Sequence, residues 1–410
     1  MFYNDIEVLN FVKDNDIKFI RLAFCDIFGV QKNISIMPSE LRRAFKTGIS
    51  FDASAIRGFG DEERSDLLLF PEPQTLSVLP WRPSHGRVVR FFCNIKYPDG
   101  TPFEMDGRHI LKQTVEKARK KGFSCNIGAE CEFYLFRTDE DGSPTDIPFD
   151  NAGYLDIAPE DKGENVRREI CLTLEEMGIM PESSHHEGGP GQNEIDFKSG
   201  DAMTSADNVI TFKSVVKTIA ARNGLYATFM PKPMEDKDGN GFHINMVVQK
   251  NGNSERRYAE RFMAGIMARI RELTAFLNPE AESYKRLGEF KAPKYVTWSA
   301  ENHSQLMRIL KDENGIYRIK LRSPDPMSNP YIAYSLLIEA GLEGIEKSME
   351  LAEPFNRNLN TAEAEALEGI AKLPESLDAA LGIACGSEFV NSVLPERVIK
   401  TYMLRGKKFI

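Results

Sequence analysis

A short apolar segment that carries two glutamates constrains this chain more than any other part of it. Residues 128–136 read Gly-Ala-Glu-Cys-Glu-Phe-Tyr-Leu-Phe, the pattern of a buried β-strand. Glu130 and Glu132 are two positions apart, so a strand points both to one face, roughly 6.6 Å apart. Two carboxylates among apolar neighbours repel each other and lose hydration, and a divalent cation is the usual remedy. A solvated edge strand is the alternative interpretation.

The composition excludes several functional classes. The chain has 410 residues, enough for two domains, of which 41% are hydrophobic and 28% are charged. A net charge of −9 argues against a nucleic-acid binder. No apolar run approaches the roughly 20 residues that cross a membrane, which argues against a membrane partner. The six cysteines form no C-x-x-C pair, which is typical of reduced thiols and predicts a cytoplasmic protein.

Two regions differ in pattern, and we expect domains over residues 1–104 and 105–410. The first reads as a small α+β unit with strands at 18–24 and 88–95. The second reads as a larger α+β domain, because helices and strands alternate without a strict βαβ repeat. Its expected helices cover residues 106–121, 164–178, 206–224, 256–277 and 329–351. Its expected strands cover residues 128–136, 193–197, 227–230, 242–248 and 317–321.

A glycine-rich turn can bring two further glutamates to the first pair. Glu187 and Glu194 flank the segment Gly188-Gly189-Pro190-Gly191, so both can reach one ion. The adjacent His185 and His186 are open between metal ligands and structural histidines.

A third segment adds a histidine to these acids. His243 and Asn245 share one strand face and follow a loop, containing Gly239, that is flexible enough to fold over a ligand. A lone histidine is more often a core residue, but four nearby glutamates favour a metal role for His243.

A basic strand completes the pattern. Arg318, Lys320 and Arg322 lie on one face, which indicates either a solvated basic surface or a site for phosphates and a carboxylate. Metal-bound carboxylates with converging arginines suit phosphoryl transfer from ATP, where positioning and charge neutralisation supply most of the catalysis.

Six ordered segments resemble signatures of the bacterial type I glutamine synthetases. These segments are residues 51–59, 128–133, 185–195, 229–233, 283–287 and 321–330. The resemblance implies an N-terminal β-grasp domain and a catalytic domain with a curved antiparallel sheet backed by helices. It also implies a ring-shaped homo-oligomer, typically a dodecamer, with active sites between subunits. The implied reaction joins ammonia to the γ-carboxylate of glutamate through γ-glutamyl phosphate, with ATP as substrate and Mg²⁺ or Mn²⁺ as cofactor.

The resemblance also assigns roles to individual residues. It implies metal ligands at Glu130, Glu132, Glu187, Glu194 and His243. It implies catalytic residues at Asp52, Arg286 and Arg322. It implies substrate contacts at Glu132, Gly239, His243, Arg286, Arg322, Asp66 and Tyr154. It implies ATP contacts at Asn245, Arg308 and Arg318.

Four positions depart from the pattern of that family. Lys320 replaces a carboxylate ligand of the second metal, and Lys291 replaces a glutamate of the flap over the site. His303 replaces an arginine that steadies the transferred phosphate, and Ala55 replaces a serine of the ammonium pocket. A lysine paired with Glu130 would mimic the charge of the ion without its coordination.

These departures leave alternatives open. The first is a glutamate–ammonia ligase, the family default. The second is a γ-glutamyl ligase for a different amine. The third is a catalytically impaired paralogue with a binding or regulatory role.

Overall fold

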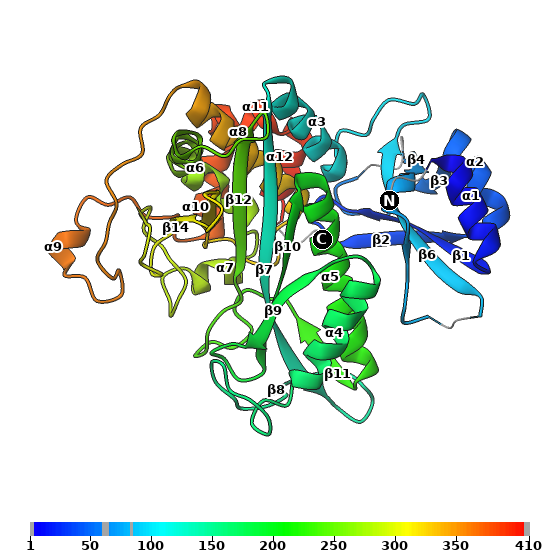
Figure 1. The fold of residues 1–410 in the computed structure, drawn as a ribbon, viewed down its shortest axis with the longest axis horizontal. Helices are drawn as coiled ribbons and strands as arrows, with labels where there is room; N and C mark the ends of the chain where they lie inside the picture. Colours follow the sequence, from blue (N-terminus) through cyan, green and yellow to red (C-terminus); the bar gives the residue numbers. More distant parts are fainter. Residues whose placement is uncertain (1–3, 60–64, 83–84, 406–410) are drawn as a thin grey trace.

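Two β-sheets divide the chain between a smaller N-terminal part and a larger C-terminal part (Figure 1). The computed structural model describes residues 4–59, 65–82 and 85–405. Within these ranges the chain forms the mixed α+β architecture that the sequence predicts.

The N-terminal sheet has the strand order β2-β1-β6-β4-β3, with β5 also pairing with β6. Its strands are β1 (Ile17–Cys25), β2 (Gln31–Ile36), β3 (Ile49–Asp52), β4 (Asp66–Pro71), β5 (Ser77–Val78) and β6 (Arg87–Lys96). Its helices are α1 (Asp5–Asp14) and α2 (Leu41–Thr47), with short 3₁₀ turns at Pro38–Glu40 and Pro73–Thr75. The expected strands at 18–24 and 88–95 are confirmed as β1 and β6, which pair in parallel.

The C-terminal sheet has the order β13-β14-β15-β12-β7-β10-β9, and β8 and β11 also pair with β7. Its strands are β7 (Phe123–Thr138), β8 (Pro144–Pro148), β9 (Pro181–His186), β10 (Gln192–Asp201), β11 (Leu225–Thr228), β12 (Phe242–Lys250), β13 (Trp298–Ser299), β14 (Met307–Lys311) and β15 (Tyr317–Leu321). Every pair is antiparallel except β13 with β14. All five strands expected in this domain are present, and β7 extends beyond its expected ends on both sides.

The helices of the C-terminal part pack against the larger sheet or against one another, except the short helix at Ala364–Leu367, which lies apart from the sheet (Figure 1). They are α3 (Gly107–Lys120), α4 (Glu164–Glu176), α5 (Ala202–Arg222), α6 (Arg256–Leu277), α7 (Ala281–Arg286), α8 (Pro330–Glu346), α9 (Ala364–Leu367), α10 (Leu377–Cys385), α11 (Glu388–Val393) and α12 (Glu396–Met403). The five expected helices are confirmed as α3, α4, α5, α6 and α8. Helices α6 and α8 cross so closely at Gly265 that only glycine fits there. A Cβ added at this residue would lie 2.1 Å from the carbonyl oxygen of Ala340. No helix in the described ranges is long and apolar enough to span a membrane.

Buried polar contacts join the two parts of the chain. Arg108 of α3 donates to the side-chain oxygen of Asn94 on β6 at 3.2 Å and pairs with Asp207 of α5 at 3.1 Å, and the Tyr331 hydroxyl donates to the same Asp207 carboxylate at 2.6 Å. The Asn329 side chain donates to the carbonyl of Ile27 in the N-terminal part at 2.9 Å. Buried hydrogen bonds to charged groups are worth about 1.5–3 kcal/mol each, so these contacts fix the N-terminal sheet against the helices.

Candidate active site

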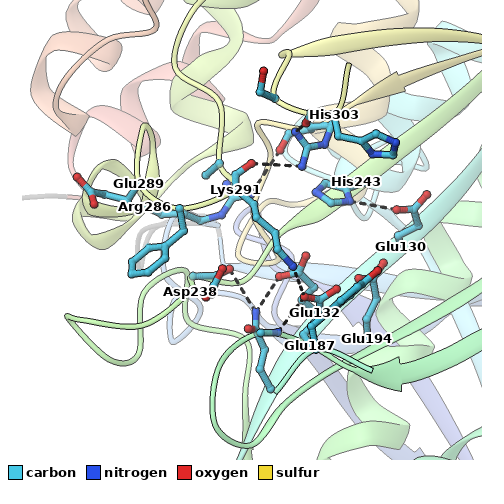
Figure 2. Close-up of a pocket in the computed structure, with 18 of the residues that line it drawn as sticks. Glu130, Glu132, Glu187, Glu194, Asp238, His243, Arg286, Glu289, Lys291 and His303 are labelled. Atoms are coloured by element: carbon cyan, nitrogen blue, oxygen red, sulfur yellow. Dashed lines mark hydrogen bonds and ion pairs between the residues drawn. The ribbon is translucent and has the colours of Figure 1, made fainter. Parts of the chain in front are cut away.

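The register of four strands gathers acids and histidines on one face of the larger sheet. Glu132 of β7 lies directly opposite Glu194 of β10, which in turn lies opposite His185 of β9. The next level on the same face joins Asp196 of β10, Glu130 of β7 and His243 of β12. This face lines a cavity of about 710 Å³ (Figure 2).

Glu187 follows β9 and joins the first level of this cluster. The His185 Nε2 atom lies 3.1 Å from Glu187 Oε1 and 3.7 Å from Glu194 Oε2. One ligand atom from each of these three residues lies within 4.8 Å of the others. This group contains His185 and not Glu132, the ligand that the family resemblance implies. Glu132 accepts a hydrogen bond from Gln192 at 2.9 Å.

Burial and mutual repulsion raise the pKa of two carboxyls in the cluster. Burial, and then the charge of Glu187, raises the pKa of Glu132 to about 7. Burial, and then the charge of Glu132, raises the pKa of Glu194 well above its usual range. A divalent ion would favour the ionised form of both groups. Carboxylate oxygens with one imidazole nitrogen are a donor set that fits such an ion.

His186 lies on the other side of β9 and has a structural environment. Its Nε2 atom is 2.9 Å from Asp150 Oδ1, and its Nδ1 atom is 2.7 Å from the carbonyl oxygen of Glu187. The ring is fully buried. Although burial opposes protonation, the hydrogen bond with Asp150 raises the pKa of His186. The two histidines therefore have different environments. His185 faces the acids, as a metal ligand would, whereas His186 is a structural residue that contacts the backbone of Glu187.

Lys320 takes part in the second level of the cluster. Its Nζ atom contacts Glu130 Oε2, which also lies 3.0 Å from His243 Nδ1. The other Glu130 oxygen accepts a hydrogen bond from Asn245 at 2.8 Å. Burial opposes ionisation of Glu130, but His243 and Lys320 outweigh it and hold its pKa far below the usual range. One ligand atom each from Glu130, Glu194 and His243 lies within 4.8 Å of the others, but a fixed ammonium group already neutralises Glu130, and this charge disfavours a second divalent ion there.

Lys291 makes a corresponding contact in the first level (Figure 2). Its Nζ atom lies 3.0 Å from Glu187 Oε2 and 4.3 Å from the centroid of the Tyr154 ring. Burial opposes ionisation of Glu187, but His185 and Lys291 lower its pKa to about 2. Both lysines that depart from the family pattern therefore pair with carboxylates of the cluster.

Two buried arginines line the same cavity as the acids. Arg286 donates to the carbonyl of Ser323 at 2.8 Å, and Arg322 donates to the carbonyl of Lys291 at 3.2 Å. In the described part of the chain neither guanidinium has a carboxylate within 4.0 Å. Burial, and then the charge of Arg286, lowers the pKa of Arg322 to about 10. Two buried cations supported only by carbonyls form a site for an anionic ligand.

The loop before β12 supports both the acids and the arginines of the cavity. A Cβ added at Gly239 would lie 2.4 Å from the Pro231 carbonyl oxygen and 2.8 Å from Arg286 Cγ, so the loop requires glycine there. The amide of Gly241 donates to Glu132 Oε2 at 2.8 Å. This loop therefore positions one arginine and one glutamate together.

Some predicted site residues lie outside the cavity lining. Asn245 reaches it through Glu130, and Arg308 donates to His303 Nδ1 at 3.2 Å. Arg318 lies on β15 and is exposed. His303, Tyr154 and Gly239 line the cavity itself.

The N-terminal site residues are not brought to this cavity within one chain. Asp52 and Asp66 are register partners on β3 and β4, and both are exposed. Ala55 is exposed in the loop that follows β3. Asp52 accepts hydrogen bonds from the amide and hydroxyl of Ser54 at 2.9 and 2.7 Å.

Sequence reasoning gave no site role to several polar residues that line the cavity, among them Asp196, Gln192 and Asp238. Asp196 is two positions after Glu194, and this spacing on a strand was sufficient to place it on the same face. Gln192 and Asp238 also line the cavity. Their positions follow from the turn before β10 and the loop before β12, which periodicity does not specify.

Comparisons with known proteins agree with this geometry. The family model "Glutamine synthetase, beta-Grasp domain" matches residues 16–98, and "Glutamine synthetase, catalytic domain" matches residues 104–408. A glutamine synthetase of Clostridium saccharobutylicum is 43% identical over 414 residues, covering 98% of this chain and 94% of that protein. A glutamine synthetase of Methanosarcina mazei is 44% identical over 410 residues, covering 97% and 92%.

Solved structures show the same fold. The chain of a GmaS/ADP complex aligns with a TM-score of 0.87 and 28% identity, covering 96% of this chain and 94% of that one. The Plasmodium falciparum glutamine synthetase aligns with a TM-score of 0.85 and 24% identity, covering 98% and 95%, and supports the fold alone. The fold and the matched domains define an ATP-dependent ligase. This chain belongs to the glutamine synthetase family.

Proposed function

We propose that this protein uses ATP to join an amine to the γ-carboxylate of glutamate. Ammonia is the amine that the names of its relatives support. The observation that carries the proposal is the cavity itself, in which buried acids face two buried guanidinium groups without carboxylate partners among the described residues. This arrangement separates a cation-binding wall from an anion-binding wall.

The anion-binding wall would hold the substrates. Arg286 and Arg322 would contact the carboxylates of glutamate, because planar guanidinium groups match carboxylate geometry. Arg308, Arg318 and Asn245 would contact ATP from the neighbouring strands. The GmaS structure with ADP supports a nucleotide site in this fold.

The cation-binding wall would hold one Mg²⁺ or Mn²⁺ ion through Glu132, Glu187, Glu194 and His185. When bound, the ion supplies charge neutralisation for the phosphate oxygens of ATP. Glu130, which also contacts His243, would keep its pairing with Lys320, so that a fixed ammonium group offsets this carboxylate in place of a second ion.

The reaction has two steps. An oxygen of the glutamate γ-carboxylate attacks the γ-phosphorus of ATP, and ADP leaves with the bonding electron pair. The amine nitrogen then attacks the acyl carbon, and inorganic phosphate leaves. A carboxylate accepts the proton of the amine, and Asp52 is our candidate for this role.

Asp52 requires a neighbouring subunit for that role, because it does not line the cavity of its own chain. We therefore propose a homo-oligomer in which the N-terminal domain, ending near residue 104, completes the site of the next catalytic domain. Mass photometry tests this, and we expect a mass several times the 46.3 kDa of one chain. We also propose a cytoplasmic location, since all six cysteines are free thiols.

The experiment that tests the function is phosphate release from purified protein with Mg-ATP and glutamate. Ammonia, methylamine and polyamines are supplied one at a time, with reactions lacking glutamate as controls. We expect release that depends on both glutamate and at least one amine. Phosphate release at the same rate with and without glutamate contradicts the proposal.

A catalytically impaired paralogue is the second candidate. The specific observation that favours it is the pairing of Lys320 with Glu130 and of Lys291 with Glu187. In that case ATP and glutamate bind, as calorimetry would show, while no amine supports phosphate release.

A further inference from the structure

The ammonium group of Lys291 lies in a subsite built for a cation. One side of this subsite is the carboxylate of Glu187, 3.0 Å from Nζ, and another is the face of Tyr154, 4.3 Å away. A carboxylate combined with an aromatic face is the chemistry that recognises an alkylammonium group.

Other residues hold the walls of this subsite in place. Glu187 Oε1 lies 3.1 Å from His185 Nε2. The amide of Gly188 donates to Glu187 Oε2, the oxygen that pairs with Lys291, at 3.0 Å. The His185 ring also packs edge-on against Tyr154, with centroids 5.7 Å apart. The subsite is therefore complete without Lys291, which enters it from a separate segment.

The backbone of this segment, residues 288–291, is held in place, but the side chain of Lys291 is largely exposed. Gly288 and Phe290 have φ angles of +90° and +50°, and the carbonyl of Lys291 accepts a hydrogen bond from Arg322 at 3.2 Å. The Lys291 side chain is 56% exposed even though its Nζ atom pairs with Glu187. It therefore reaches over the mouth of the cavity and can be displaced without moving the buried core.

We propose that Lys291 determines which amine the site accepts, because its own ammonium group occupies the acceptor subsite. This inference rests on the proposed function for the statement that the amine is a reactant. A short tether gives the lysine an effective concentration of about the millimolar range or above. Free ammonium offers the same charge and no additional contact, so it competes poorly. A primary alkylamine with further groups for the cavity can displace the lysine, and such amines are the substrate class that we assign.

Chemical rescue tests the occupancy without any catalysis. Lys291→Ala removes a fragment equivalent to n-propylammonium, so we add n-propylammonium chloride in the tens of millimolar range and measure the melting temperature. The buffer contains a chelator, because Glu187 is also a candidate metal ligand, and sodium chloride matches the ionic strength. We expect the salt to stabilise Lys291→Ala by a few degrees, as for any ligand that binds only the folded state, and to leave the natural protein unchanged.

Lys294→Ala is the matched control, since Lys294 is an exposed lysine of the same segment. It should behave like the natural protein. Equal shifts in the natural protein and Lys291→Ala, or no shift in a folded Lys291→Ala, overturn the proposal. Circular dichroism establishes folding, and Lys291→Met replaces Lys291→Ala should the latter not fold, with ammonium as its probe because this change removes only the Nζ group.

Lysine acylation of the natural protein provides a measurement that needs no variant. Mass spectrometry compares the acylation rates of Lys291 and Lys294, and we expect Lys291 to react more slowly. Equal rates contradict occupancy of the subsite.

The catalytic arm separates this inference from the proposed function. In phosphate-release assays we expect the KM for ammonia to fall at least about tenfold in Lys291→Met, with little change in the KM for glutamate. Rescue without phosphate release in any variant means that the ligase function fails while the occupancy stands. Phosphate release with an unchanged KM for ammonia, and no rescue, means the reverse.

Discussion

Lys320 on β15 reaches across β12 to pair with Glu130 on β7. The pairing places an ammonium group where the glutamine synthetase pattern implies a second divalent ion. The side chain of Lys320 is 17% exposed, so little water screens this contact. Unlike a metal ion, the lysine cannot gather several oxygens around one centre.

Metal stoichiometry follows from this pairing. We expect the natural protein to bind one Mn²⁺ ion per chain, measured by calorimetry and elemental analysis. Lys320→Glu restores a carboxylate and removes a cation, so we expect two ions per chain. Lys311→Glu on the neighbouring strand β14 makes the same charge change away from the cluster, and it should retain one. Two ions in the natural protein would show that Lys320 leaves Glu130 when metal is present.

Ammonia-dependent turnover should respond to both lysines together. Lys291→Glu with Lys320→Glu reverses two charges in the cavity, and we expect phosphate release with ammonia to rise about tenfold, equivalent to about 1.4 kcal/mol in the barrier. Lys294→Glu with Lys311→Glu is the control pair. An unchanged or lower rate in a folded double variant would show that other residues limit the reaction with ammonia.

Gly239→Ala should disturb the glutamate site through Arg286. The added Cβ would lie 2.4 Å from a carbonyl oxygen and 2.8 Å from Arg286 Cγ, so the loop or the arginine must move. We expect a loss of about 1–3 kcal/mol in the free energy of unfolding and a KM for glutamate that rises about tenfold. Gly382→Ala is the control, because a Cβ there meets no atom within 4 Å. Steady-state kinetics and urea unfolding of both variants decide the matter.

The pH dependence of stability should change in Glu343→Gln. Hydrogen bonds from Arg269, at 2.7 and 2.8 Å, lower the pKa of Glu343 from its ordinary value of 4.5 to about 2. Because the folded pKa is the lower one, the carboxylate stabilises the fold fully above pH 4.5, and this contribution is lost as the pH falls toward 2.

We therefore expect Glu343→Gln to cost about 1 kcal/mol at pH 7, after allowance for solvent screening, and less at pH 3.5. Urea unfolding at both pH values measures the difference. Glu350→Gln, at an exposed position, should cost little at either pH. A cost for Glu343→Gln that is independent of pH would contradict the electrostatic explanation.

The sequence was sufficient for much of the fold and for the acid cluster. Alternation along β7 placed Glu130 and Glu132 on one face, and the two-residue period has no other outcome for a strand. The pairing of Lys320 with Glu130 was also anticipated. Strand order could not be derived, since register among β7, β10 and β12 depends on contacts between distant segments.

The contact of Lys291 with Glu187 is of this non-local kind. The two residues are 104 positions apart, and the turn that carries Lys291 contains two residues with positive φ, Gly288 and Phe290. The division of roles between His185 and His186 likewise required the strand β9, for which the sequence has no clear pattern. Asp52 lies away from the cavity of its own chain, so a single chain does not show whether this residue belongs to an active site.

The two lysines differ in how firmly the fold holds them. Lys320 extends from the strand β15, and its side chain is only 17% exposed beside Glu130, so its surroundings hold the positive charge in place. Lys291 extends from a surface turn and can rotate outward on its own, so its charge is removable. The cavity thus contains one positive charge that the fold holds in place and a second that an incoming ligand can displace.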